Sequence, residues 1–287
     1  MKIGFIGLGI MGESMSENII KKHDDTVYVF DVVKEKTDKL AALGGVGCSN
    51  AKELAEKSDV IITMVPKSEH LTSVYDEILP VFGPGKIGID MSTIDPSVSM
   101  ATAEKVKATG AQFADCPVVK SKPAAINGTL GILVGCDEDL YDTIRPILLY
   151  MGCNVKRMGE NGSGITMKIC HNCLVGQIQN GVNETLALAG KFGIAPKDFA
   201  EAVSYGGAQN FYLDSQWQNL EADNWTTAFS LANEHKDLGI CLKLAEEVGL
   251  PMPGAANAKA VYDYGMEHDM GAMDFRTTYK IVRERKN

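Results

Sequence analysis

The sequence of 287 residues lacks the features that would place it in a membrane or outside the cell. No apolar run approaches the ~18 consecutive residues that suggest a membrane-spanning helix. The opening residues, MKIGFIGLGIMG, show no charged segment followed by a long apolar segment and a cleavage site, so we expect no secretory signal. The seven cysteines are scattered and odd in number, which favours reduced thiols over a disulfide framework. We therefore expect a cytoplasmic protein that does not associate with membranes.

The chain is also short of positive charge, with 28 Lys and Arg against 37 Asp and Glu and a formal net charge of -9. Nucleic-acid binding depends on a basic surface that neutralises phosphates, so we do not expect nucleic acid as a partner. The sequence contains no internal repeat and no low-complexity segment. Its hydrophobic content of 45% suffices for the core of one large domain or of two smaller ones.

The first half of the chain alternates short apolar runs with amphipathic stretches. The apolar runs are bounded by Gly, Asp or Pro and are expected to form buried strands at 2–7, 26–31, 59–65, 86–90, 113–118, 130–135 and 154–159. The stretches MSENIIKK, KEKTDKLAAL, AKELAEK and EHLTSVYDEIL lie between the first four runs and are expected to form helices. This alternation predicts an α/β fold with a Rossmann-type, doubly wound parallel sheet and helices on both faces.

The pattern changes after about residue 160. From Gly164 to Gly190 the chain has no proline and its apolar residues recur at helical spacing, which predicts a helix of about 27 residues and about 40 Å. The rest of the chain is also expected to be helical, with breaks at FGIAPKD and VGLPMPG. The sequence therefore predicts two domains, 1–162 and 163–287, of which the second is all-helical and built on the long helix.

Three glycines, Gly7, Gly9 and Gly12, form the pattern G-x-G-x-x-G between the first expected strand and the first expected helix. Glycine at these positions permits a tight turn and the close approach of a pyrophosphate, whose charge lies at the helix N-terminus. Asp31 ends the second strand, where a carboxylate accepts hydrogen bonds from ribose hydroxyls and repels a 2′-phosphate. The alternative is a glycine-rich structural turn with a surface aspartate. We predict a dinucleotide site that prefers NAD to NADP.

Four blocks of the sequence resemble the β-hydroxyacid dehydrogenase family, which includes 3-hydroxyisobutyrate dehydrogenase and tartronate semialdehyde reductase. The blocks are GFIGLGIMGESMSENI, DCPVVKSKPAAINGTL, GSGITMKICHN and HKDLGICLKLAEEVGLPMP. The resemblance implies a dinucleotide-binding domain joined by a long helix to an all-helical substrate and dimerisation domain. It implies metal-free hydride transfer between NAD(H) and a primary alcohol or aldehyde near an acidic group. It also implies a homodimer or homotetramer, with Ile10 and Met11 of the first block against the cofactor.

Two residues of the third block match the catalytic pair of the family. Lys168 falls on the family's catalytic lysine and Asn172 on its partner, and their i, i+4 spacing puts both on one face of the helix. An ammonium donates a proton to the carbonyl oxygen as hydride reaches carbon, and the neutral amine accepts a proton in reverse, which requires a lysine pKa lowered to about 7–8. We expect Asn172 to hold the same oxygen or the substrate's acidic group. The alternative for Lys168 is a solvated lysine early in a helix.

The same stretch contains a CxxC pair, Cys170 and Cys173, which raises a redox or zinc site as an alternative. Both cysteines lie inside the expected helix rather than at its N-terminus, where the dipole lowers a thiol pKa, so we expect them to pack as small hydrophobic residues. His171 resembles the substrate-contacting histidine of 6-phosphogluconate dehydrogenase. Val175, however, occupies the position of that enzyme's glutamate, which argues against decarboxylation. We expect His171 to contact substrate, and the alternative is a histidine packed at the domain interface.

The second block departs from the family pattern D-x-P-V-S-G-G, whose serine and glycine backbone hold a carboxylate. Val119, Lys120 and Ser121 stand in the places of the serine and the two glycines. Lysine adds a point charge with three donors, and the block also resembles a subgroup that includes sulfolactaldehyde reductase, where an arginine at this place binds a sulfonate. We expect Lys120 and Ser121 to bind the anionic group of a small substrate, as a sulfonate, a phosphonate or a distal carboxylate. The alternative for Lys120 is a surface lysine in an altered loop.

Three further residues match positions that the family uses around its cofactor. Val65 lies where the chain passes the cofactor, Thr93 lies at the nicotinamide end, and Lys236 matches a lysine that reaches the active site from the helical domain. Each has a structural alternative, as a strand end, a helix cap or a salt-bridged lysine. Lys34 and Lys36 lie close enough to Asp31 to keep NADP open as a cofactor.

The leading hypothesis is an NAD(H)-dependent enzyme that interconverts a small acidic aldehyde and its primary alcohol, as sulfolactaldehyde reductase does. Within the family, 3-hydroxyisobutyrate dehydrogenase and tartronate semialdehyde reductase activities are the alternatives. A non-catalytic NAD-binding module is the alternative of another class, but such a module has no need of Lys168 and Asn172. Imine reductases are a third possibility, although they usually lack this lysine.

Overall fold

The computed structural model of the protein describes residues 1–284, and the chain forms two compact units, Met1–Lys168 and Ile169–Asn287. Helix α8 (Ser163–Lys191) carries the division between them. The domain boundary predicted at 162/163 falls at the start of this helix, and the compact units divide in its second turn. Within residues 1–284 no helix is both long enough and apolar enough to cross a membrane.

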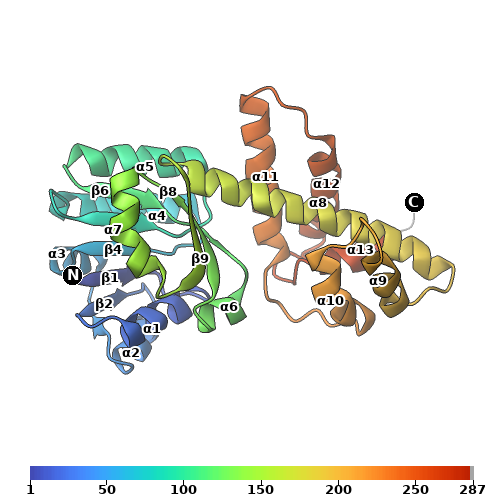
Figure 1. The fold of residues 1–287 in the computed structure, drawn as a ribbon, viewed down its shortest axis with the longest axis horizontal. Helices are drawn as coiled ribbons and strands as arrows, with labels where there is room; N and C mark the ends of the chain where they lie inside the picture. Colours follow the sequence, from blue (N-terminus) through green and yellow to red (C-terminus); the bar gives the residue numbers. More distant parts are fainter. Residues whose placement is uncertain (285–287) are drawn as a thin grey trace. The chain divides into compact units, whose positions relative to one another are not determined.

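Unit 1 is built on a nine-stranded sheet with the order β3-β2-β1-β4-β5-β6-β8-β7, and β9 pairs with β8 (Figure 1). The strands are β1 (Ile3–Ile6), β2 (Val27–Phe30), β3 (Val46–Gly47), β4 (Val60–Thr63), β5 (Ile87–Asp90), β6 (Gln112–Asp115), β7 (Val118–Val119), β8 (Leu130–Gly135) and β9 (Gly152–Gly159). Strands β1 to β6 are parallel, as predicted. Beyond β6, strand β8 runs antiparallel to β6 and β7 and parallel to β9.

Helices cover both faces of this sheet, which confirms the doubly wound fold. They are α1 (Gly12–Lys22), α2 (Lys34–Ala41), α3 (Ala51–Lys57), α4 (Ser68–Ile78), η1 (Leu79–Val81), α5 (Pro96–Ala108), α6 (Lys122–Ile126) and α7 (Glu138–Leu148). Ile3 and Phe5 of β1 pack in one hydrophobic cluster with residues of α1, α2 and α7, whereas Ile6 packs in a second cluster with residues of α3, α4 and α5. Successive side chains of a strand point to opposite faces, so each cluster belongs to one face of the sheet.

Unit 2 is all-helical among its described residues, apart from one isolated β-bridge between Ser230 and Asp274. It contains most of α8, followed by α9 (Pro196–Ser204), α10 (Phe211–Glu221), α11 (Leu231–Glu247), α12 (Pro253–Glu267) and α13 (Thr277–Glu284). Helix α8 has 29 residues, and the helix predicted from 164 to 190 is thereby confirmed. Its inner side packs against α11 and α12 in a core that includes Ile169, Leu238 and Tyr262.

A buried carboxylate, Asp90, ends strand β5 and joins the end of β4 to the loop after β5. Its Oδ1 accepts hydrogen bonds from the hydroxyls of Ser92 at 2.6 Å and of Thr63 at 2.8 Å. Burial raises the pKa of Asp90 from 3.8 to about 6, because the hydrogen bonds offset only part of the cost of removing the charge from water. Between these two pH values the folded state holds a proton that the unfolded chain has lost.

This raised pKa predicts that the folded state loses stability as pH rises from about 4 to about 6, by about 3 kcal/mol at most. Asp90→Asn cannot ionise, so the variant lacks this contribution. We therefore expect the free energy of unfolding of Asp90→Asn minus that of the wild type to be larger at pH 7 than at pH 4, because only the wild type loses stability over this range. Urea denaturation at both pH values measures the difference, and a difference that is the same at pH 4 and pH 7 would show that Asp90 does not titrate in this range.

Candidate active site

The glycine loop lies between β1 and α1 and requires glycine for steric reasons. Gly7 has φ +95°, and a Cβ at this position would lie 2.3 Å from the carbonyl oxygen of Met64. A Cβ at Gly12 would lie 2.0 Å from the carbonyl oxygen of Gly7. The first and third glycines therefore allow the turn and the close packing of α1 that the motif predicts.

The middle glycine has a different role, because a Cβ at Gly9 would meet no atom within 4 Å. The space above Gly9 is therefore open to a ligand. Met11 precedes α1 without a side-chain cap for the first amides of the helix, and Ile10 is 70% exposed. An open surface at an uncapped helix N-terminus suits an anionic diphosphate, so these residues fit a nicotinamide dinucleotide.

Asp31 lies directly after β2 and holds the glycine loop. Its Oδ2 accepts a hydrogen bond from the amide of Leu8 at 2.7 Å, and its Oδ1 accepts one from the amide of Val33 at 2.9 Å. The ammonium of Lys36 lies 3.6 Å from Oδ1. The carboxylate thus joins the first turn of the dinucleotide motif to the end of β2, and each oxygen keeps lone-pair capacity for a ribose hydroxyl.

Val65 and Thr93 lie on neighbouring loops at the same edge of the sheet, after β4 and β5. The amide of Val65 donates to the hydroxyl of Ser92 at 2.9 Å, and this hydroxyl in turn donates to Asp90. Gly7 is close to the same segment, since its Cβ would lie 3.5 Å from a methyl group of Val65. The structure therefore brings the glycine loop, Val65 and the residue before Thr93 together. Contact of Val65 and Thr93 with the cofactor stays a prediction.

Lys120 occupies the loop between β7 and α6 with φ +78°, a left-handed conformation that favours glycine. This is the position at which the family pattern has its first glycine, so the lysine keeps the glycine-like backbone at a cost in strain. Its ammonium donates to the carbonyl oxygen of Thr129 at 2.8 Å and is exposed. Ser121 precedes α6 without capping it through its side chain.

The start of α8 is fixed by Asp115 at the end of β6. This carboxylate is 1% exposed, and its two oxygens accept the amides of Gly162 at 2.7 Å and Ile165 at 2.8 Å. Burial raises the pKa of Asp115, although the bonds from these two amides act in the opposite direction. Lys168 follows Ile165 by one helical turn, so the buried carboxylate sets the position of the segment that carries it.

Close contacts around Asp115 also depend on glycine. A Cβ at Gly164 would lie 2.7 Å from the carbonyl oxygen of Asp115, and one at Gly135 would lie 2.5 Å from its Oδ1. The side chain of Asn161 adds hydrogen bonds to the carbonyl oxygens of Phe113 at 2.9 Å and Gly135 at 3.0 Å. The first turn of α8 is thus held directly against β6 and β8.

In unit 2, a second buried carboxylate joins three predicted site residues. The amide nitrogen of Asn172 on α8 donates to Oδ2 of Asp237 on α11 at 2.6 Å, and the ammonium of Lys236 lies 3.3 Å from Oδ1. The amide oxygen of Asn172 lies 3.1 Å from Nδ1 of His171. Because that oxygen only accepts, Nδ1 of His171 is the donor in this contact.

The expectation that both cysteines of the CxxC pair pack as small hydrophobic residues is confirmed for Cys173 and wrong for Cys170, which is exposed on α8. Cys173 is buried in the unit 2 core with Ile169 and Cys241. Partial burial of the Cys170 thiol, together with the neighbouring Cys173, raises its pKa. A reactive thiol needs the opposite shift.

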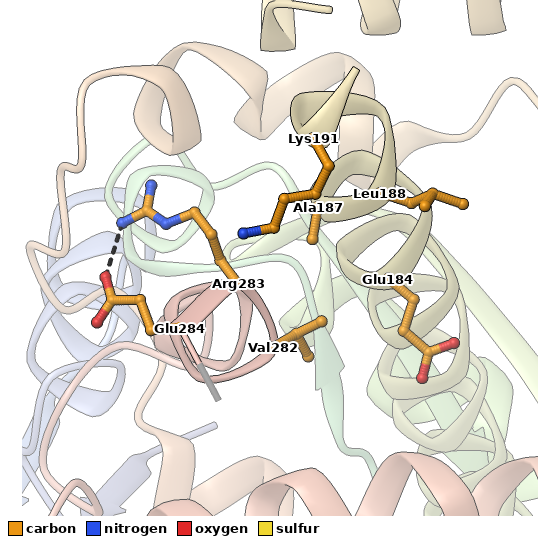
Figure 2. A pocket seen from close by; sticks show the side chains of 7 residues that line it. All are labelled: Glu184, Ala187, Leu188, Lys191, Val282, Arg283 and Glu284. Carbon is orange, nitrogen blue, oxygen red and sulfur yellow. Dashed lines mark hydrogen bonds and ion pairs between the residues drawn. The ribbon is translucent and has the colours of Figure 1, made fainter. Parts of the chain in front are cut away.

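A cavity of about 560 Å³ lies elsewhere in unit 2, between the end of α8 and α13 (Figure 2). None of its lining residues is among the predicted site residues. They are Glu184, Ala187, Leu188, Lys191, Val282, Arg283 and Glu284.

Three aspartates that the sequence reasoning did not assign support these residues. Asp90 and Asp115 each end a buried apolar strand, and Asp237 directly follows Lys236. An acidic residue at the end of an apolar run is a signal that could have identified the first two. Nothing in the sequence pairs Asp237 with Asn172, because the two residues are 65 positions apart.

Comparison with known proteins agrees with this arrangement. Residues 2–159 match the model of the NAD-binding domain of 6-phosphogluconate dehydrogenase, and residues 162–282 match that described as NAD-binding of NADP-dependent 3-hydroxyisobutyrate dehydrogenase. The chain is 30% identical to 2-(hydroxymethyl)glutarate dehydrogenase of Eubacterium barkeri, over 98% of this chain and 94% of the relative. It is 31% identical to 2-hydroxy-3-oxopropionate reductase of Escherichia coli, over 92% and 90%.

A solved structure covers both units. The 3-hydroxyisobutyrate dehydrogenase of Mycobacterium tuberculosis, solved with L-serine, has a TM-score of 0.92 and 26% identity and covers 98% of this chain and 99% of its own. The chain thus combines a dinucleotide-binding unit with the helical unit of enzymes that act on hydroxyl groups of small acids. It belongs to the β-hydroxyacid dehydrogenase family of nicotinamide-dependent oxidoreductases.

Proposed function

We propose that this enzyme interconverts a small acidic aldehyde and its primary alcohol, with Lys168 as the proton donor and acceptor. The observation that carries the proposal is the placement of Lys168 and Asn172 one turn apart on α8. The first turn of this helix is held by hydrogen bonds to Asp115. When bound, the nicotinamide ring supplies or accepts the hydride. The protein's own contribution is to hold the carbonyl group and to move one proton.

In the direction of reduction, the Lys168 ammonium donates a proton to the aldehyde oxygen, where negative charge develops as hydride reaches the carbonyl carbon. In the direction of oxidation, the neutral amine takes the alcohol proton. Asn172 holds the same oxygen or the substrate's acidic group, and Asp237 keeps its amide in place. His171 contacts substrate through Nε2, because Nδ1 of the same ring is engaged with Asn172. Lys236 and Thr93 complete the set as cofactor contacts.

The anionic group of the substrate is proposed to bind at Lys120 and Ser121. Lys120 holds a backbone conformation that is strained for lysine and relaxed for glycine, which supports a requirement for its side chain. Our best candidate is a sulfonate, as in a sulfolactaldehyde-reductase-like enzyme. A carboxylate, as in 3-hydroxyisobutyrate dehydrogenase or tartronate semialdehyde reductase, is equally supported, since the similar proteins carry such names and one was solved with L-serine.

The alternative of another class was a non-catalytic NAD-binding module, and membership of a family of oxidoreductases argues against it. It requires only the glycine loop and Asp31. The buried Asp237, which orients Asn172 and Lys236 in unit 2, has no role in such a module. This favours the enzyme.

We also propose that the protein is a homodimer or homotetramer in the cytoplasm. The cavity between α8 and α13 is lined by Glu184 and Lys191, and Leu188 on the same helix is 61% exposed (Figure 2). A surface with charges of both signs and an exposed apolar side chain suits an isologous contact with a second copy. Light scattering tests the assembly, and a monomeric mass would contradict it. The cytoplasmic location stays a prediction.

Lys168→Ala should lower kcat by roughly 10²–10⁴ while NADH binding is retained, because a general acid is lost and the dinucleotide site in unit 1 is not altered. Steady-state kinetics on the best aldehyde measure the first effect, and NADH fluorescence titration measures the second. Lys197→Ala, an exposed lysine on α9, is the matched control and should have normal kinetics. Retention of more than half of kcat in Lys168→Ala would refute the assignment.

Asp31 should make the enzyme prefer NADH, because its carboxylate repels the 2′-phosphate of NADPH. We expect a higher kcat/KM with NADH than with NADPH on the same aldehyde. A preference for NADPH would overturn this proposal and would indicate that Lys36, beside the carboxylate, determines the cofactor.

Lys120→Gly should have two opposite effects. The unfolding free energy should rise by about 1 kcal/mol, because glycine adopts φ +78° without strain. The KM for the acidic aldehyde should rise roughly ten- to a hundredfold with a smaller change in kcat, because a charge-assisted hydrogen bond is lost equally from ground and transition states.

The loss should be larger for a sulfonate than for a simple hydroxy acid such as 3-hydroxyisobutyrate. Lys120→Gly with a higher stability and unchanged kinetics on every acidic aldehyde would mean that Lys120 is a surface residue. The sulfonate preference would then lose its support.

A further inference from the structure

Helix α6 is fastened to α1, the helix that follows the glycine loop. The side-chain amide of Asn18 on α1 donates to the carbonyl oxygens of Ala125 at 2.8 Å and Ile126 at 3.2 Å at the end of α6. Asn18 is buried, so these bonds are shielded from water and fix α6 on the surface of α1. Lys122 is the first residue of this fastened helix.

Lys122 shares a cavity with the glycine loop. The cavity has a volume of about 280 Å³ and is lined by Leu8, Gly9, Ile10, Glu13, Lys36 and Lys122. It therefore includes the open surface above Gly9, where an added Cβ would meet no atom within 4 Å. A lysine from the segment after β7 thus borders the surface on which a dinucleotide approaches the backbone most closely.

The charges around this cavity are balanced except at Lys122. Glu13 is paired with Lys39 at 2.8 Å, and Lys36 faces Asp31 at 3.6 Å. Lys122 makes no ion pair with any residue from 1 to 284. The cavity is left with one positive charge in excess, next to the N-terminal end of α1.

We propose that Lys122 binds the diphosphate of the nicotinamide dinucleotide and is a cofactor-binding residue outside the glycine motif. An ammonium here adds a charge-assisted hydrogen bond to an anion that the amides of the loop alone would otherwise hold. The diphosphate is favoured over a 2′-phosphate, because Lys122 borders Gly9 and Ile10, whereas the ribose end is marked by Asp31. It is favoured over the substrate's anionic group, because the lysine that replaces a glycine in the substrate block is Lys120.

Removal of the charge should weaken NADH and NADPH binding alike, by about tenfold, because both carry the diphosphate. The affinity of the wild type should also fall more steeply with salt than that of the variant. Lys122→Arg keeps the charge and should bind NADH within about threefold of the wild type.

The experiment is a fluorescence titration of the full chain with NADH and with NADPH, and a calorimetric titration with ADP-ribose and with AMP. The variants are Lys122→Met, Lys122→Arg and the control Lys21→Met, which removes an exposed charge at the far end of α1. Thermal unfolding of each variant establishes that it is folded. The proposal predicts weaker NADH, NADPH and ADP-ribose binding in Lys122→Met, a smaller change for AMP, and no change in Lys21→Met.

A loss confined to NADPH would place Lys122 at the 2′-phosphate, and unchanged dinucleotide affinity with a raised aldehyde KM would place it at the substrate. Either result overturns the proposal, as does an equal loss in Lys21→Met. Should Lys122→Met be unfolded, weak NADH binding by a folded Lys122→Gln carries the same test. The titrations measure binding without turnover, so the test stands even if no acidic aldehyde proves to be a substrate.

Discussion

The organisation of unit 1 depends on one buried carboxylate, Asp115, which accepts the amides of Gly162 and Ile165 at the start of α8. A charge that is 1% exposed is costly unless it is hydrogen-bonded, and here the donors are amides that a helix start would otherwise leave without a partner. The same contact requires glycine at 135 and 164, where a side chain would collide with Asp115 itself. The proposed proton donor, Lys168, is placed by this contact one turn further along the helix.

Aspartates that accept hydrogen bonds from a neighbouring segment recur along the carboxyl edge of the sheet. Asp31 after β2 holds the glycine loop through the amide of Leu8, and Asp90 at the end of β5 holds Val65 through Ser92. Asp90 and Asp115 are directly paired in neighbouring parallel strands. In each case an aspartate at a strand end accepts hydrogen bonds from a segment that carries a proposed cofactor or catalytic residue. The sheet thus sets the positions of these loops through side chains as well as through its backbone.

The sequence was sufficient for features whose cause is local. The apolar runs predicted β1, β2, β4 and β5. The glycine spacing predicted the turn, because Gly7 and Gly12 are needed for close contacts within the motif and with the residue that follows β4. Strand β3 was not predicted, since Val46–Gly47 is exposed and too short to show a period. The reversed direction of β8 leaves no trace in hydrophobicity. The clamp of Asp115 and the pairing of Asn172 with Asp237 could not be predicted, because the partners are 50 and 65 residues apart. Lysine is unfavourable in a left-handed backbone conformation, so the residue type at position 120 does not indicate it. Only the structure shows this conformation.

We propose that the enzyme transfers hydride from NADH to an aldehyde that carries an anionic group. The most direct measurement is the rate of NADH oxidation with a panel of aldehydes of equal length that end in a sulfonate, a phosphonate, a carboxylate or a neutral group. We expect at least one acidic aldehyde to exceed the neutral one in kcat/KM by about tenfold or more, because only the acidic aldehyde forms a charge-assisted hydrogen bond with the protein. Equal rates for neutral and acidic aldehydes, or no oxidation with any of them, would contradict it.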